Sequence, residues 1–280
     1  MDAHESSWCR THGPRPMTYR VKFLEDISSL HDSGDYSQFR NIQSLQENVS
    51  GVNTRRANGE LKYILENNPE ILIENLDKIK EWDSFGNPTT YEFSKKGIPQ
   101  SGEKDFSINC SDSVFPPLSD IIRIKERLKL SPDFDIVELG CGFGIETKVF
   151  HDIVGYNSYT HVDLPDMLKL QSVYLTNFKT PNVIYINPYQ DIDNLKTHYD
   201  LFISNFAFTE LSPDVQEFYF DKIIRKCNMG IILGKMWPKH NRITHNSISK
   251  VQIGWIESEF NVKYEANHAC GKGGILYFWK

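Results

Sequence analysis

The pattern of hydrophobic and polar positions in residues 115–280 alternates between short apolar runs and stretches of helical spacing. The apolar runs predict strands at 134–137, 159–162, 183–186, 199–204 and 229–233. Strands that alternate with amphipathic helices indicate a parallel sheet with helices on both faces. A last helix is expected over 247–260. Two final strands, 262–266 and 274–279, have no helix between them and therefore indicate an antiparallel hairpin at the sheet edge.

The first part of the chain has helical spacing without strand signals. One helix is expected after Asp35, and another from about Gly59, broken at Asn68-Pro69 and continuing to Ile79. Residues 1–20 contain Gly and Pro and few aliphatic side chains, which predicts a loosely ordered terminus.

Residues 82–113 are rich in Gly, Pro, Ser and charges, which predicts a long connector across the mouth of a site. Pro116-Pro117 then favours the start of a helix that carries Leu118, Ile121 and Leu128. The predicted division is a flexible N-terminus over 1–20, a helical appendage with its connecting loop over 21–114, and an α/β domain over 115–280.

Composition and charge exclude several classes of function. Hydrophobic residues make up 39% of the 280 residues, as in a packed soluble protein. No apolar run approaches the ~20 residues that span a bilayer, and the N-terminus lacks a secretory pattern, so we expect a cytoplasmic protein without a membrane partner. A net charge of -6 argues against a nucleic-acid partner. The scattered cysteines form no C-x-x-C pair, which argues against a disulfide framework or a zinc site.

The clearest motif lies between the first predicted strand of the α/β domain and the following helix. Its sequence is Glu138-Leu139-Gly140-Cys141-Gly142-Phe143-Gly144, and Asp163 ends the next strand. Glycines allow a sharp turn and the close approach of a ligand, and an acid at the end of the second strand can accept both hydroxyls of a ribose. The motif therefore predicts a pocket for an adenosine-containing cofactor.

The spacing also helps to identify the cofactor. The dinucleotide fingerprint requires a third glycine where this chain has Ile145. A carboxylate before the loop would oppose a pyrophosphate but suits a cation, so Glu138 and Asp163 favour S-adenosylmethionine over NAD. An ordinary strand-to-helix turn with a solvated acid is the alternative, and the coincidence of the glycines with two acids makes it less favoured.

The acidic G-x-G-x-G loop within five alternating strands, followed by a terminal strand pair, resembles the class I S-adenosylmethionine-dependent methyltransferases over about residues 115–280. That resemblance implies a Rossmann-like, seven-stranded, mostly parallel sheet whose last strand is inserted antiparallel. A narrower resemblance, to the sugar O-methyltransferases of glycan and polysaccharide gene sets, is carried by three stretches: 82–88; 163–165 with Gln171, Tyr174 and Leu175; and 204–211 with Gln216 and Tyr219. It implies methyl transfer to a sugar hydroxyl on a nucleotide-linked sugar or a glycan terminus.

The site residues follow from the motif and from these resemblances. For the cofactor we expect Glu138, Gly140, Cys141, Gly142, Gly144, Asp163, Leu164, Pro188, Tyr189, Gln190 and Asn205, with Asp191 as an alternative contact to the adenine. The resemblance offers Asp83, Asn87, Tyr91 and Phe208 as acceptor contacts, although Asp83 and Asn87 could instead fix the turn at Gly86-Asn87-Pro88.

A hydroxyl acceptor calls for a base, and Glu210, after the fourth strand, is the first candidate, with a helix-terminal acid as the equally weighted alternative. His268, then His245 and His240, rank below it. The other histidines show no grouping that suggests a metal, so no metal is expected. Transfer to a nitrogen or to another small molecule, or a non-catalytic subunit that binds S-adenosylmethionine, remain open, as does a homodimer.

Overall fold

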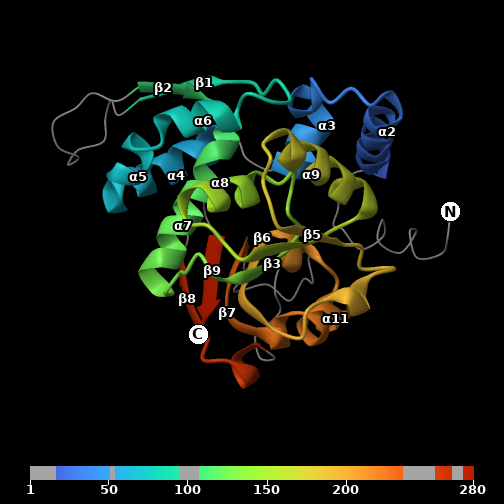
Figure 1. Cartoon of the computed structure of the whole chain (residues 1–280), viewed down its shortest axis with the longest axis vertical. Helices are drawn as coiled ribbons and strands as arrows, with labels where there is room; N and C mark the ends of the chain where they lie inside the picture. Colours follow the sequence, from blue (N-terminus) through green and yellow to red (C-terminus); the bar gives the residue numbers. More distant parts are fainter. Residues whose placement is uncertain (1–16, 51–53, 95–106, 236–255, 267–273) are drawn as a thin grey trace.

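The structure is a computed structural model that describes residues 17–50, 54–94, 107–235, 256–266 and 274–280. Its centre is a seven-stranded sheet of order β5-β4-β3-β6-β7-β9-β8 (Figure 1). The strands of this sheet are β3 (Asp135–Leu139), β4 (Ser158–Val162), β5 (Val183–Ile186), β6 (Tyr199–Asn205), β7 (Cys227–Lys235), β8 (Lys263–Ala266) and β9 (Gly274–Trp279). Strands β3 to β7 are mutually parallel, and β9 runs antiparallel to both β7 and β8.

This topology confirms the predicted fold class, a Rossmann-like α/β sheet with an antiparallel final strand. The antiparallel hairpin expected at the sheet edge is also confirmed, because β8 and β9 pair antiparallel there. Strand β9 is inserted between β7 and β8, so β8 is the edge strand.

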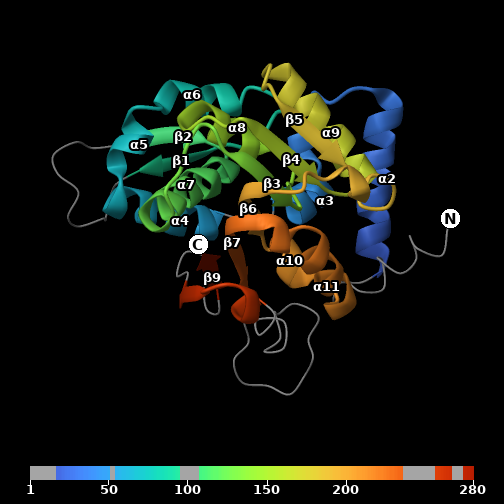
Figure 2. The same cartoon turned by 60° about the horizontal axis from the view of Figure 1, so that its bottom comes forward.

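Helices cover both faces of the sheet (Figures 1 and 2). In the second half of the chain they are η3 (Asp112–Val114), α7 (Phe115–Arg127), α8 (Ile145–Ile153), α9 (Pro165–Asn177), η4 (Ile192–Asn194), α10 (Ala207–Glu210), α11 (Pro213–Lys222) and η5 (Ile224–Lys226). Along β6, Leu201 and Ile203 belong to the core under α7, α8 and α9, whereas Phe202 belongs to the core under α11. The two-residue period of the strand therefore places one hydrophobic core on each side of the sheet.

The N-terminal region is helical, as predicted, but its boundaries differ. Its elements are α2 (Met17–Ser33), η1 (Phe39–Asn41), α3 (Gln43–Leu45), the π-helical turn η2 (Gln46–Ser50), α4 (Thr54–Asn67), α5 (Pro69–Ile73) and α6 (Leu76–Trp82). The first described helix begins at Met17, inside the stretch 1–20 that was expected to be loosely ordered, and that expectation stays a prediction. Phe23, Ile27 and Leu30 form the buried face of α2 at helical spacing.

The single helix expected after Asp35 is wrong. Ile42 has extended backbone angles and separates η1 from α3. The amide of Arg40 donates to the carbonyl of Gly86 at 2.9 Å, and the side chain of Gln46 donates to the carbonyl of Arg40. Tertiary hydrogen bonds therefore replace the helical ones at this point.

Residues 82–113 are not only a connector. They contain β1 (Tyr91–Ser94) and β2 (Ser107–Cys110), which pair antiparallel. Phe93 is buried against Phe115, with ring centroids 4.7 Å apart. The hydrophobic pattern did not predict these strands because each shows an apolar–polar alternation over only four residues. Residues 95–106 of this connector and most of the expected helix 247–260 lie outside the described residues, and residues 256–259 are helical.

The N-terminal region packs directly on the glycine loop. Phe39 meets Phe143 edge-on at 5.6 Å, and the guanidinium of Arg40 lies 4.9 Å from the centre of the Phe143 ring. The same guanidinium donates to Asp83 at 2.7 Å, to the hydroxyls of Ser111 and Ser113, and to the carbonyl of Trp82. Helices before residue 83 and the sheet therefore share one hydrophobic core.

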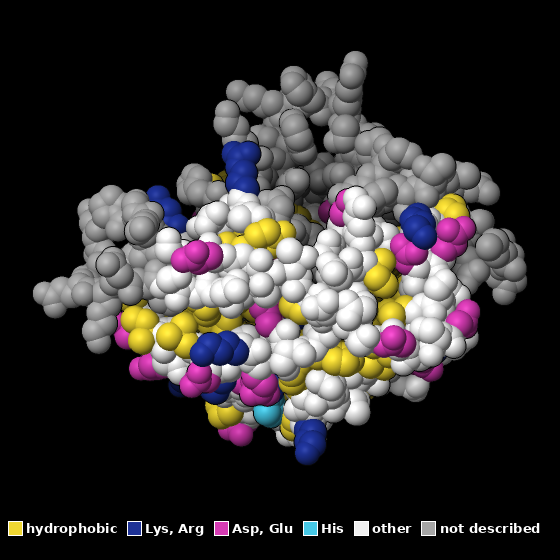
Figure 3. Space-filling view, turned by 90° about the horizontal axis from the view of Figure 1, so that it is seen from above, with side chains coloured by type: hydrophobic (Ala, Val, Ile, Leu, Met, Phe, Trp, Pro, Cys, Tyr) yellow, Lys and Arg dark blue, Asp and Glu magenta, His cyan; other side chains and the backbone are white. Residues whose placement is uncertain are grey.

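Acidic and basic side chains intermingle on the face seen in Figure 3, where lysines and arginines stand singly among carboxylates. None of the described helices combines the length and the apolar character that crossing a bilayer requires.

The buried pair of Arg40 and Asp83 gives a test of this packing. Replacing Arg40→Met leaves the Asp83 carboxylate buried without its cation, so the free energy of unfolding should fall by about 3–5 kcal/mol in urea titrations. The control Lys62→Met removes an exposed partner of Glu66 and should change it by less than about 0.5 kcal/mol. A loss below about 1 kcal/mol for Arg40→Met would show that the pair does not hold the two regions together.

Candidate functional site

The glycine loop joins β3 to α8 and adopts left-handed backbone angles. Gly140 has a φ of 77°, and a Cβ there would lie 2.1 Å from the Cβ of Ala207. A Cβ on Gly142, whose φ is 56°, would lie 3.3 Å from the carbonyl oxygen of Val49. Only glycine therefore lets this loop pass between the start of α10 and the N-terminal region.

Asp163 braces the loop from the end of β4. Its carboxylate accepts hydrogen bonds from the amides of Cys141 (2.9 Å) and Leu164 (2.8 Å) and from the side chain of Gln171 (2.8 Å). Burial raises the pKa of Asp163 to about 6, and these hydrogen bonds oppose that rise. A carboxylate has about four acceptor positions, so Asp163 has acceptor capacity left for a ligand, and its contact with a ribose stays a prediction.

A buried series of hydrogen-bonded polar side chains fixes the position of Gln171 beside Asp163. Thr147 lies 2.6 Å from Nε2 of His161, whose Nδ1 lies 2.8 Å from Oε1 of Gln171. Burial lowers the pKa of His161 to about 4, so the ring is neutral. Nδ1 then donates to Gln171, and Nε2 accepts from Thr147. The amide nitrogen of Gln171 is thereby directed at Asp163 and at the carbonyl of Gly142.

Glu138 is the last residue but one of β3 and is only 2% exposed. The hydroxyl of Tyr159 donates to it at 2.9 Å. Burial raises the pKa of Glu138 to about 8, with Asp163 and Asp120 adding to the rise and the Tyr159 hydrogen bond opposing it. Glu138 and Asp163 lie on either side of Cys141, whose thiol contacts the Glu138 carbonyl and whose amide binds Asp163. The two acids therefore flank the loop, as the motif predicted.

Glu138, Cys141 and His161 place one ligand atom each within 4.8 Å of one another, which corrects the expectation that no histidine has a metal-like grouping. The grouping arises because Glu138 and His161 are register partners in adjacent strands. Both ring nitrogens of His161 are already hydrogen-bonded. That the protein binds no metal stays a prediction.

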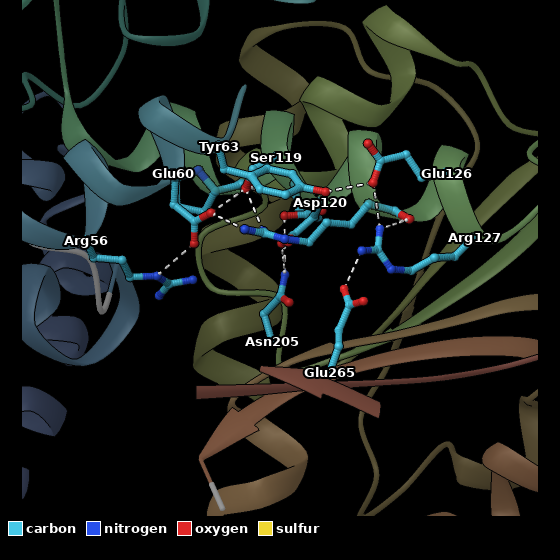
Figure 4. A network of polar contacts seen from close by, with 12 residues as sticks. Arg56, Glu60, Tyr63, Ser119, Asp120, Glu126, Arg127, Asn205 and Glu265 are labelled. Carbon is cyan, nitrogen blue, oxygen red and sulfur yellow. Dashed lines mark hydrogen bonds and ion pairs between the residues drawn. The ribbon is translucent and has the colours of Figure 1, made fainter. Parts of the chain in front are cut away.

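A second group of charges lies where β3 and β6 end side by side. Figure 4 shows Asn205 at the end of β6 pointing toward Asp120 of α7, with Glu60 and Arg56 reaching in from α4. Asn205 donates to Asp120 at 3.0 Å and to Glu146 at 3.4 Å. Arg123 bridges Glu60 and Asp120 at 2.6 and 2.8 Å.

The chain leaves β3 toward β4 and β5 and then returns to β6 on the other side. This is a topological switch point, where open α/β sheets bind ligands beyond the carboxyl ends of their strands. The charged group therefore occupies the position where a ligand is expected.

The remaining predicted cofactor residues lie at the same end of the sheet. Pro188, Tyr189 and Gln190 form the turn after β5, where the side chain and carbonyl of Asn187 accept the amides of Tyr189 and Gln190. Tyr189 is 50% exposed, as an aromatic side chain that stacks on a base would have to be.

The predicted acceptor contacts are dispersed. Phe208 is 1% exposed in the core under α11, where it has no surface to offer a substrate. Asp83 is engaged by Arg40 and Ser111, and Asn87 donates to Gln38 at 2.6 Å with a φ of 48°. These bonds match the turn-fixing alternative. Tyr91 is partly exposed on β1.

Of the candidate bases, only Glu210 lies among the described residues. Glu210 is the exposed last residue of α10 and stays a prediction as base. His268, His245 and His240 lie outside the described residues.

Sequence reasoning missed Asp120, Glu146, Arg56 and the Thr147–His161–Gln171 chain as parts of the site. Their only local signal is a polar residue on an otherwise apolar helix face or strand. The contacts that bring these residues together join segments far apart in the sequence.

The raised pKa of Glu138 makes stability depend on pH. Between its ordinary value of 4.5 and about 8 the folded protein holds a proton that the unfolded chain has lost, so the free energy of unfolding should fall as pH rises through this range. Glu138→Gln keeps an acceptor for Tyr159 but cannot ionise, so its urea-unfolding energies at about pH 5 and about pH 8 should differ less than those of the wild type. The exposed control Glu66→Gln should keep the wild-type slope, and an unchanged slope in Glu138→Gln would refute the assignment.

Comparison with known proteins gives structural matches only. No family model and no curated protein matches the chain. A SAM-dependent methyltransferase from Aquifex aeolicus is 15% identical over 59% of this chain and 89% of its own, with a TM-score of 0.45. An O-methyltransferase family protein from Burkholderia thailandensis is 12% identical over 60% of this chain and 57% of its own, with a TM-score of 0.45. Likeness of this degree does not assign a function, which has to come from the site.

Proposed function

We propose that this protein is an S-adenosylmethionine-dependent methyltransferase that acts on a sugar hydroxyl. The observation that carries the proposal is a cluster of buried carboxyl groups at the switch point. Among the described residues, those of Glu60, Asp120, Glu138 and Glu146 are buried beside the guanidinium groups of Arg56 and Arg123, and burial raises the pKa of Asp120, Glu138 and Glu146.

Uncompensated charge inside a protein is strongly unfavourable unless a proton or a ligand offsets it. A dinucleotide would add two phosphate charges of the same sign. S-adenosylmethionine adds a sulfonium and an ammonium group, which would favour the ionised form of these carboxyl groups. The charge balance therefore supports this cofactor and opposes NAD.

The residues present fit such a cofactor. Glu138 would lie toward the methionine end, Asp163 and Leu164 toward the ribose, and the turn at 188–190 toward the adenine. The sulfonium supplies an activated methyl group. The protein's contribution is to hold the acceptor oxygen in line with that methyl group and to exclude water from it.

Support for a sugar acceptor comes from the three stretches that resemble sugar O-methyltransferases, because they converge on the glycine loop. Tyr174, in the second stretch, donates to the carbonyl of Trp82 in the first and packs on Phe143 with centroids 5.0 Å apart. Ala207, in the third stretch, meets Gly140. Parts of all three stretches therefore lie close to the glycine loop.

Incubation with methyl-labelled S-adenosylmethionine and a panel of nucleotide sugars tests the proposal. The expected product is a singly methylated sugar whose label resides on oxygen, as identified by mass spectrometry. Calorimetry should show binding of S-adenosylmethionine and none of NADH.

Three results would count against the proposal. Binding of NADH would overturn the cofactor. A label on nitrogen would replace the hydroxyl acceptor with an amine. Tight cofactor binding with no labelled product across the panel would favour a non-catalytic subunit.

A further inference from the structure

Glu146 has an unusual environment in the first turn of α8. Its side chain is 6% exposed. One carboxylate oxygen accepts the long 3.4 Å contact from Asn205, and the other has no hydrogen-bond partner among the described residues. Buried carboxylate oxygens in proteins are almost always satisfied, so a group outside the described chain is expected to face this one.

The position of Glu146 indicates which kind of group would face its unpartnered oxygen. It follows β3, and its contact Asn205 ends β6, so the two side chains meet across the topological switch point. A ligand held by the loops after β3 and β4 would present its reactive end here. The unpartnered oxygen therefore lies at the switch point, where a ligand is expected.

Charged groups from every packed element face Glu146. Burial is the largest cause that holds its pKa well above the usual range, and Asp120 of α7 and Glu138 of β3 raise it further. Arg56 of α4 and Arg123 of α7 oppose the rise. The balance favours the protonated form of this carboxyl, and a cation placed nearby would favour the carboxylate.

We propose that Glu146 is the catalytic base that takes the proton of the acceptor hydroxyl; this inference rests on the proposed function. The hydroxyl oxygen forms a bond to the methyl carbon as the bond from that carbon to sulfur breaks, and its electron pair stays on sulfur. The hydroxyl proton goes to the unpartnered oxygen of Glu146. The products are a methyl ether, a neutral thioether and protonated Glu146.

Glu146 would become a base before the acceptor arrives. Its carboxylate form would be favoured by a sulfonium charge held nearby, so Glu146 would lose a proton on cofactor binding and present a buried acceptor without a hydrogen-bond partner among the described residues. Glu210 differs because it is exposed at the end of α10. A base open to water lacks that desolvated environment.

Isothermal titration of the full-length protein tests the first step. S-adenosylmethionine is titrated at about pH 7 in buffers of different ionisation enthalpy, which gives the number of protons released. The wild type should release about one proton more than Glu146→Gln, and S-adenosylhomocysteine, which lacks the sulfonium charge, should release fewer from the wild type. The control Glu66→Gln carries the same change on an exposed helix position and should behave as the wild type.

Turnover of the acceptor found in the panel tests the second step. Glu146→Gln should lower kcat by about 10²- to 10⁴-fold and abolish the rise of kcat with pH, while the Kd for the cofactor changes by less than about tenfold. Glu146→Asp should keep the proton release with reduced kcat, and it serves as the decisive variant if Glu146→Gln does not fold.

The two proposals fail in different ways. A wild type that does not bind S-adenosylmethionine overturns the proposed function, and this inference with it. Binding with equal proton release in the wild type and Glu146→Gln overturns the inference alone. So does a loss of turnover in Glu210→Gln with full turnover in Glu146→Gln.

Discussion

Carboxylates removed from water need protons, hydrogen-bond donors or cations as partners. This requirement determines how the side chains are arranged where β3, β4 and β6 end. Asp163 is matched by two amides and by Gln171. Asp120 and Glu60 share the guanidinium of Arg123. Glu138 has the hydroxyl of Tyr159, and Glu146 has only a long contact. The acids at this end of the sheet therefore differ in how fully their oxygens are hydrogen-bonded, and Glu146 is the least satisfied of them.

Both halves of the chain build this arrangement. The α4 helix supplies Glu60 and Arg56, and the ring of Phe206 at the end of β6 lies 4.8 Å below the Arg56 guanidinium. Phe206 also has a φ of 67°, an unfavourable backbone state for a non-glycine residue. Such strain persists where surrounding contacts fix it, and here the amide of Phe206 is held by the carbonyl of Leu233 at 2.7 Å.

Much of the second half of the fold could be predicted because its signals are local. Apolar runs marked the strands, and Pro165 and Pro213 marked the starts of α9 and α11. The glycine loop and its two acids could be found for the same reason, since each adjoins a strand end. The placement of β9 between β7 and β8 followed from family resemblance and not from the hydrophobic pattern.

The other features depend on tertiary contacts that no window of sequence contains. The break at Ile42 follows from bonds between Arg40 and Gly86, and the short strands β1 and β2 are fixed by pairing with each other. Asp120 and Glu146 become neighbours only because α7 packs on α8 and both meet the end of β6. The sequence signal for this contact was a polar residue on an otherwise apolar helix face, and such residues have many structural roles.

The carbonyl oxygen of Val49 lies next to the position that a Cβ on residue 142 would occupy. Residues 39–50 and the glycine loop therefore pack closely together, so a change of sequence in one segment requires a matching change in the other. A chimera that receives the loop of a related enzyme would need this N-terminal segment replaced along with it. The smallest exchangeable unit of the site is thus discontinuous, and its two pieces lie about ninety residues apart along the chain.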